Sequence, residues 1–108
     1  MKYYYKSKKG NKVLCLDHPI EEDLRYNKNA SLWQEATQSD YETYVTKKNA
    51  RIEIAHLEKE LANTDWVVVK IAEETDASEI ATLRVKYAQV IASRKANRAR
   101  INELEAIL

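Results

Sequence analysis

The fold is decided by residues 83–108, which read LRVKYAQVIASRKANRARINELEAIL. Eight of these residues recur at alternating intervals of four and three, so they form one continuous stripe along a long helix. They are Leu83, Tyr87, Val90, Arg94, Asn97, Ile101, Leu104 and Leu108. A stripe of this kind is typical of a helix that packs against other helices. We expect these eight residues to form the interface between copies of the chain.

Two neighbouring positions of this stripe, Arg94 and Asn97, are polar. If they are buried, they need partners, because an unpaired buried polar group costs free energy. Polar residues inside such stripes commonly fix the alignment and the number of the associating helices. The alternative is that the stripe turns toward solvent at these two residues. The sequence leaves both interpretations open.

A second long helix is predicted to begin at Ser39. Ser39 is followed three residues later by Glu42, a capping-box pattern, and no Gly or Pro occurs before Asn63. Apolar residues at heptad spacing in this segment are expected to pair with the last helix, and Trp66 is expected to join them. The predicted pairing residues are Ile54, Leu57, Leu61 and Trp66.

The flanks of the two predicted helices carry opposite charges. The first is mostly acidic, at Glu53, Glu58 and Glu60, and the second is basic, at Arg84, Lys86, Arg98 and Arg100. This pattern favours two helices that pair antiparallel or across subunits. The alternative is that these residues form ordinary solvated faces.

The segment between the helices is ambiguous. Thr64 and Asp65 can end the first helix, and the run Thr75-Asp76-Ala77-Ser78 can begin the last one, with Glu79 in its first turn. The intervening run Trp66-Val67-Val68-Val69-Lys70-Ile71 has the propensity of a strand, but its context suits a short helix. The residues alone do not decide between strand and helix for 66–73.

The N-terminal residues predict a small β-hairpin region. Residues 2–6 and 13–16 are two short strand-forming runs around a turn that holds the only glycine, Gly10. A short helix is expected over 20–24, a loop over 25–31, and a short strand or turn over 32–36.

Composition sets the fold class. One Gly and one Pro in 108 residues are too few for the tight turns of an all-β protein. We therefore expect a mainly α chain (α+β), with a β-hairpin region over 1–38 and a long two-helix hairpin of coiled-coil character over 39–108. A net charge of +1 argues against a globally basic nucleic-acid binder.

The sequence predicts no enzyme and no cofactor. Cys15, Asp17 and His18 lie close together, but a zinc site needs three or four convergent ligands, and the only other histidine is His56. No nucleophile set and no glycine-rich phosphate loop is present. No apolar run is long enough to span a membrane, and the basic N-terminus lacks the apolar region of a secretory signal. Nucleic-acid binding is expected to be unlikely, because only Tyr87 interleaves with the basic residues of the last helix.

Three segments resemble small proteins encoded in the tail modules of phages and prophages, of the tail-fibre-assembly-like kind. They are WQEATQSDY at 33–41, LANTDWVVVKIAE at 61–73, and the ending that contains Arg94, Arg98 and INELE at 101–105. This resemblance covers about the last two-thirds of the chain. At the arginine-flanked position where those proteins often have Trp, this chain has Asn97, and where an acidic residue often precedes Ile-Asn, it has Arg100.

The resemblance implies a non-enzymatic phage tail component, found in the virion tail or in the host cytoplasm during assembly. It would act through helix–helix protein contacts, as a structural part of a tail fibre or baseplate or as an assembly helper. The expected partners are other phage tail proteins and the chain itself, as an oligomer and most simply a trimer, because tail fibres are threefold. The resemblance also favours a short helix over 66–73. The alternative is a cytoplasmic helical adaptor that binds nucleic acid through its basic C-terminal helix.

Overall fold

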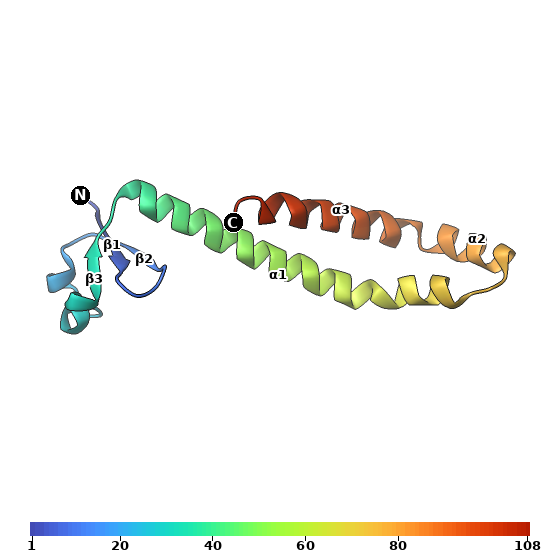
Figure 1. Cartoon of the computed structure of the whole chain (residues 1–108), viewed down its shortest axis with the longest axis horizontal. Coiled ribbons are helices and arrows are strands. Elements are labelled where there is room, and N and C mark those ends of the chain that lie inside the picture. The colour runs from blue at the N-terminus through green and yellow to red at the C-terminus, as the bar shows by residue number, and fades with distance from the viewer. The chain divides into compact units, whose positions relative to one another are not determined.

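The computed structural model describes all 108 residues and confirms a mainly α chain with a small antiparallel sheet (Figure 1). Contacts divide it into two compact units, Met1–Lys48 and Asn49–Leu108. In chain order the elements are β1 (Tyr3–Ser7), β2 (Val13–Leu16), the 3-10 helices η1 (Ile20–Glu22) and η2 (Asn27–Leu32), β3 (Trp33–Glu35), α1 (Gln38–Glu73), α2 (Ala77–Lys86) and α3 (Ala88–Glu105).

The first unit is built on a three-stranded antiparallel sheet with the order β2-β1-β3. The predicted hairpin is confirmed, and its turn is closed by a hydrogen bond from the Ser7 amide to the Lys12 carbonyl at 3.0 Å. The short run at 33–35 pairs with β1 as a third strand. This third strand gives the hairpin the support that an isolated two-stranded pair lacks in water.

One face of the sheet is covered by the segment between β2 and β3. Tyr5, Leu14, Leu16 and Ile20 form the buried cluster there, and the Ile20 amide donates to the Tyr5 hydroxyl at 3.1 Å. The prediction of a plain loop over 25–31 is wrong, because much of this stretch forms η2. Its short i→i+3 turns hold the chain close to the sheet, and Ala30 packs against the cluster.

The helix α1 begins one residue earlier than predicted, at Gln38, and its capping box lies two residues earlier. The Asp40 amide donates to Thr37 Oγ1 at 3.0 Å, and the Thr37 amide donates to Asp40 Oδ2 at 3.0 Å. Thr37 and Asp40 therefore take the roles that we expected of Ser39 and Glu42. The bond from the Thr37 amide also lowers the pKa of the Asp40 carboxyl.

The boundary between the units lies further along the chain than the expected division at residue 38. The ring of Tyr41, in the first turn of α1, lies 5.7 Å from that of Tyr4 in β1. The first turns of α1 therefore belong with the sheet, and the first unit extends to Lys48.

The expected end of the first helix at Thr64 and Asp65 is also wrong. The chain stays helical to Glu73, so residues 66–73 are helical as the resemblance suggested, but they are not a separate helix. The hydroxyl of Thr64 donates to the carbonyls of Glu60 and Leu61 in the preceding turn. Because the hydroxyl has its hydrogen bond within the helix, Thr64 does not end the helix. Val67, one turn later, is fully buried.

In the second unit, α2 and α3 run back alongside α1 and form the predicted helical hairpin (Figure 1). The helix α2 begins within the run expected to start it, and Asp76 is its cap, because the Asp76 side chain accepts from the amides of Ser78 and Glu79. The prediction of one uninterrupted last helix is wrong. Tyr87 has φ −106° and ψ 21°, which separates α2 from α3, and α3 ends at Glu105, so Leu108 lies beyond it.

Candidate functional site

The second unit is held together where the two heptad stripes meet. The buried apolar residues of this hairpin are Ala50, Val67, Ile101 and Leu104, and they come from both of its arms. The predicted pairing residues Ile54, Leu57 and Leu61 are half-buried on α1. Two helices cannot enclose each other completely, so much of this stripe keeps some contact with solvent.

The centre of the hairpin contact is polar and is organised by Arg94. Its guanidinium donates to the Leu61 carbonyl at 2.6 Å, to Thr64 Oγ1 at 2.7 Å and to Asp65 Oδ1 at 2.8 Å. Only 12% of the side chain is exposed, and its Nε has no hydrogen-bond partner. Of the two interpretations left open by the sequence, burial with partners is therefore the one that holds for Arg94.

Two further polar contacts join α3 to α1. The Asn97 side chain donates to Glu60 Oε2 at 3.0 Å, and Arg100 binds both carboxylate oxygens of Glu53, at 3.0 and 3.1 Å. The Arg100 guanidinium lowers the pKa of the Glu53 carboxyl. The predicted antiparallel pairing of an acidic with a basic helix is thus formed inside one chain, although the exposed Arg100–Glu53 pair stabilises it little.

The eight residues predicted to form a subunit interface lie mostly against α1 of the same chain. Ile101 and Leu104 are buried, whereas Leu83, Tyr87, Val90, Arg94 and Asn97 are half-buried. Leu108 is 48% exposed. Contact between subunits through this stripe stays a prediction. It would have to use the exposed parts of residues that already pack within the hairpin.

A groove with a cavity of about 390 Å³ follows one side of the hairpin at the level of Arg94. Apart from Val90, the side chains that line it are polar. Those of α1 are Glu60, Asn63 and Thr64, and those of α3 are Gln89, Ser93, Arg94 and Asn97. Five of these side chains carry an amide or a hydroxyl, so the groove can exchange hydrogen bonds with a partner, although carbon atoms provide most of its exposed lining.

Next to this groove lies a cluster that we call the aromatic–lysine surface, formed by Trp66, Lys70, Lys86 and Tyr87. The Trp66 and Tyr87 rings meet edge to face, with centroids 5.4 Å apart and planes at 86°. The Nζ atoms of Lys86 and Lys70 lie 5.3 and 6.0 Å from the centroid of the Tyr87 ring. Trp66 is 53% exposed, and neither lysine forms an ion pair.

Sequence reasoning missed this surface because the residues left 66–73 open between strand and helix, and because nothing in the spacing brings Tyr87 of the other arm to Trp66. Once α1 continues, Trp66 and Lys70 are one turn apart on the same side of it. Trp66 was predicted as a pairing residue, and it does contact the opposite arm, through Tyr87. The signal that could have located the surface is the i, i+4 spacing of a tryptophan and a lysine.

The first unit holds one buried charge, Asp23, which is 2% exposed. It accepts from the amide and guanidinium of Arg25 at 2.8 to 3.2 Å, and it lies 2.8 Å from His18 Nε2. The hydrogen bonds from Arg25 hold the pKa of the Asp23 carboxyl well below its usual range. These contacts tie the segment after β2 into a fixed turn and account for His18 without a metal.

Several further findings bear on chemistry. No group of three or more His, Cys, Asp or Glu side chains is arranged to hold a metal ion, and Cys15 is a free thiol. No helix reaches the length and apolar character that crossing a membrane requires. Comparison with known proteins found no matching family model, no similar curated protein and no similar solved structure.

Proposed function

We propose that this protein is a non-enzymatic component of a phage tail, acting through helix–helix contacts with other proteins. It would be a structural part of a tail fibre or baseplate, or a helper in fibre assembly. The observation that carries the proposal is the hairpin of the second unit. Large apolar side chains stay about half exposed on it, at Trp66, Val68, Val69 and Ile91. Apolar area of this kind on a small protein is typical of a surface that another protein covers.

The specific assignment to a tail draws on the resemblance of residues 33–41, 61–73 and 94–105 to tail-fibre-assembly-like proteins. Two of those segments form the two arms of the hairpin around Arg94. Their shared residues therefore include the ones that hold the arms together, namely Leu61, Thr64, Asp65 and Arg94. On this proposal the common sequence keeps the hairpin in one alignment, and its exposed surface contacts the partner.

Nucleic-acid binding through α3 is the second candidate function. The ion pairs between α3 and α1 argue against it, because they use basic residues that phosphates would need. Of the basic residues in the last helices, Arg94 and Arg100 already bind acceptors on α1. The free ones, Arg84, Lys86, Lys95 and Arg98, are too few for an extended phosphate-binding track. A salt-dependent affinity for DNA or RNA is the property that would favour this candidate.

The experiment is deletion of the coding gene from its phage or prophage, followed by mass spectrometry and electron microscopy of the particles. A structural part is detected in wild-type virions at a fixed ratio to the other tail proteins. A helper is absent from virions, but particles formed without it lack fibres or infect poorly. Normal, fully infectious particles in its absence would overturn the proposal.

A further inference from the structure

The aromatic–lysine surface has the features of a docking point that its own chain leaves unfilled. Trp66 is about half exposed although it is the largest side chain of the hairpin, and its ring is held in place by Tyr87. Tryptophan and tyrosine held in this way are the residues that most often dominate the binding energy of protein interfaces. Lys70 and Lys86 flank the same ring.

The charges at this surface are unbalanced. Both ammonium groups lie within about 6 Å of the Tyr87 centroid and therefore within about 11 Å of each other, and neither has a carboxylate partner. Arg94 and Arg100 of the same hairpin are paired with acids, whereas Arg84, Lys95 and Arg98 have no ion pair but do not lie against an exposed tryptophan. A negative group placed between the two lysines would lower their mutual repulsion and would attract both at once.

The polar groove continues from this surface along the hairpin. Asn63, which lines the groove, is two helical turns before Lys70 on the same side of α1. On the other arm, Gln89 lines the groove two residues after the break at Tyr87. The groove and Lys70 therefore share one side of α1. A partner helix lying along that side would meet amides, hydroxyls and the Glu60 carboxylate in the groove, and the aromatic pair with its two lysines at one end, so its acidic residues belong at that end.

We propose that the aromatic–lysine surface and the adjoining groove bind an acidic helical segment of a partner protein. Its carboxylates lie against Lys70 and Lys86, and an aliphatic side chain packs on Trp66. This binding site gives the chemistry of the partner that the proposed function requires. It rests on the proposed function in one respect, namely that the partner is a protein. A protein segment fits this surface better than nucleic acid. Trp66 packs against Tyr87 edge to face and the two lysines lie near the Tyr87 ring, so the surface offers no series of open ring faces on which successive bases could stack.

The test uses the purified full chain and a synthetic peptide, so it does not depend on any role in a tail. The probe is a fluorescein-labelled peptide of about 15 residues, composed of Glu, Ala and Leu, long enough to form some helix. Binding is followed by fluorescence anisotropy at two salt concentrations. In a Trp33→Phe background, where Trp66 is the only tryptophan, its emission should shift to shorter wavelength and become harder to quench with acrylamide.

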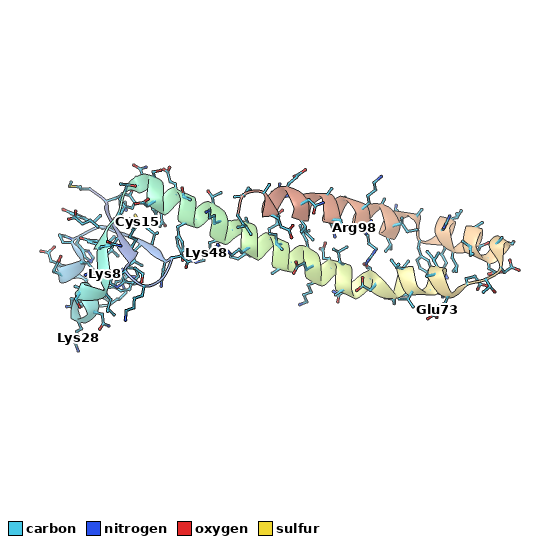
Figure 2. The ribbon with its side chains drawn as sticks, viewed as in Figure 1. Lys8, Cys15, Lys28, Lys48, Glu73 and Arg98 are labelled. Carbon is cyan, nitrogen blue, oxygen red and sulfur yellow. The ribbon has the colours of Figure 1, made fainter.

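Three variants separate this surface from general attraction by charge. Lys70→Glu/Lys86→Glu should weaken peptide binding at least about tenfold, and Trp66→Ala, which leaves the charge unchanged, should weaken it about fivefold or more. The control, Lys48→Glu/Lys95→Glu, makes the same change of charge at exposed lysines of α1 and α3 that have no ion pair, and it should change affinity less than about twofold (Lys48 is labelled in Figure 2).

Two outcomes would overturn the proposal. If the control weakens binding as much as the Lys70/Lys86 variant and Trp66→Ala has no effect, the peptide is attracted only by net charge. If a single-stranded oligonucleotide of the same charge binds more tightly than the peptide and depends on Trp66, the surface is a nucleic-acid site. Circular dichroism of each variant checks that the hairpin is folded. If Trp66→Ala does not fold, Trp66→Tyr replaces it in the binding experiment.

Discussion

At the scale of single residues, Arg94 is the side chain on which the hairpin depends most. Arg94→Ala should lower the free energy of unfolding by about 2 kcal/mol, because charge-assisted hydrogen bonds to three acceptors are lost inside a covered contact. Arg94→Met should lose less than half as much, since it fills the same space and leaves no unpaired Nε. Urea denaturation followed by circular dichroism measures both. Arg98→Ala, at an exposed arginine without a partner, is the control (Figure 2). If it costs as much as Arg94→Ala, the stated role of Arg94 is wrong.

The buried carboxylate of Asp23 makes a pH-dependent contribution in the first unit. Its pKa is lowered in the folded chain, so the stabilisation is complete above the ordinary aspartate pKa near 4 and is lost as the pH falls below that value. Asp23→Asn should therefore lower the urea midpoint at pH 7 and flatten its decline between about pH 5 and 2. Trp33 fluorescence in a Trp66→Phe background reports the first unit. Glu21→Gln, at an exposed acid without an ion pair, should retain the wild-type profile.

At the scale of helices and strands, the start of α1 gives a direct test of which residues cap it. Thr37→Ala should destabilise the first unit by about 1 kcal/mol, because the Asp40 amide loses its acceptor. Ser39→Ala should have almost no effect, although the sequence pattern pointed to Ser39. The thermal midpoint of each variant, followed by Trp33 fluorescence in the Trp66→Phe background, distinguishes the two. A larger loss from Ser39→Ala than from Thr37→Ala would contradict the observed cap.

Most elements could be predicted from the sequence, and the errors have local causes. Heptad spacing and opposite flank charges predicted the hairpin, and the run Thr75-Asp76-Ala77-Ser78 predicted where its return arm begins, because these signals depend on nearby residues. Thr64-Asp65 looks like a helix end, but the Thr64 hydroxyl donates to a carbonyl of the same helix. That Val67 belongs to the buried face of α1 becomes visible only when the opposite arm covers it. The break at Tyr87 has no Gly or Pro to announce it. The i, i+4 spacing of Trp66 and Lys70 is present in the sequence, but their contacts with Tyr87 join the two arms, and sequence spacing alone does not contain these.

At the scale of the whole molecule, we predict that the protein self-associates in solution, most simply as a trimer. The exposed apolar residues Val68 and Ile91 follow directly after Val67, which is buried, and Val90, which lines the groove, and they remain free to meet another copy. Val68→Glu/Ile91→Glu should therefore dissociate the assembly and leave the hairpin folded. Sedimentation equilibrium at tens of micromolar gives the mass.

The choice of positions matters for that experiment. Glu at Ile101 or Leu104 would open the hairpin itself, because both are buried within one chain. Val85→Glu, at a valine that is 79% exposed, is a suitable control and should leave the mass unchanged. A wild-type chain that sediments only as a monomer would refute self-association, and the docking surface for an acidic partner would be unaffected.

The turn capped by Asp76 also has a consequence for the order in which the hairpin folds. Contacts near the turn, such as Trp66–Tyr87, join residues close in sequence, whereas Glu53–Arg100 joins residues 47 apart. Closing the short loop costs less entropy, so the arms should zip together from the turn toward Ala50. In stopped-flow experiments Asp76→Ala should mainly slow folding, and Arg100→Ala should mainly speed unfolding. The residues that set the speed of assembly would then be different from those that determine how long the closed hairpin lasts.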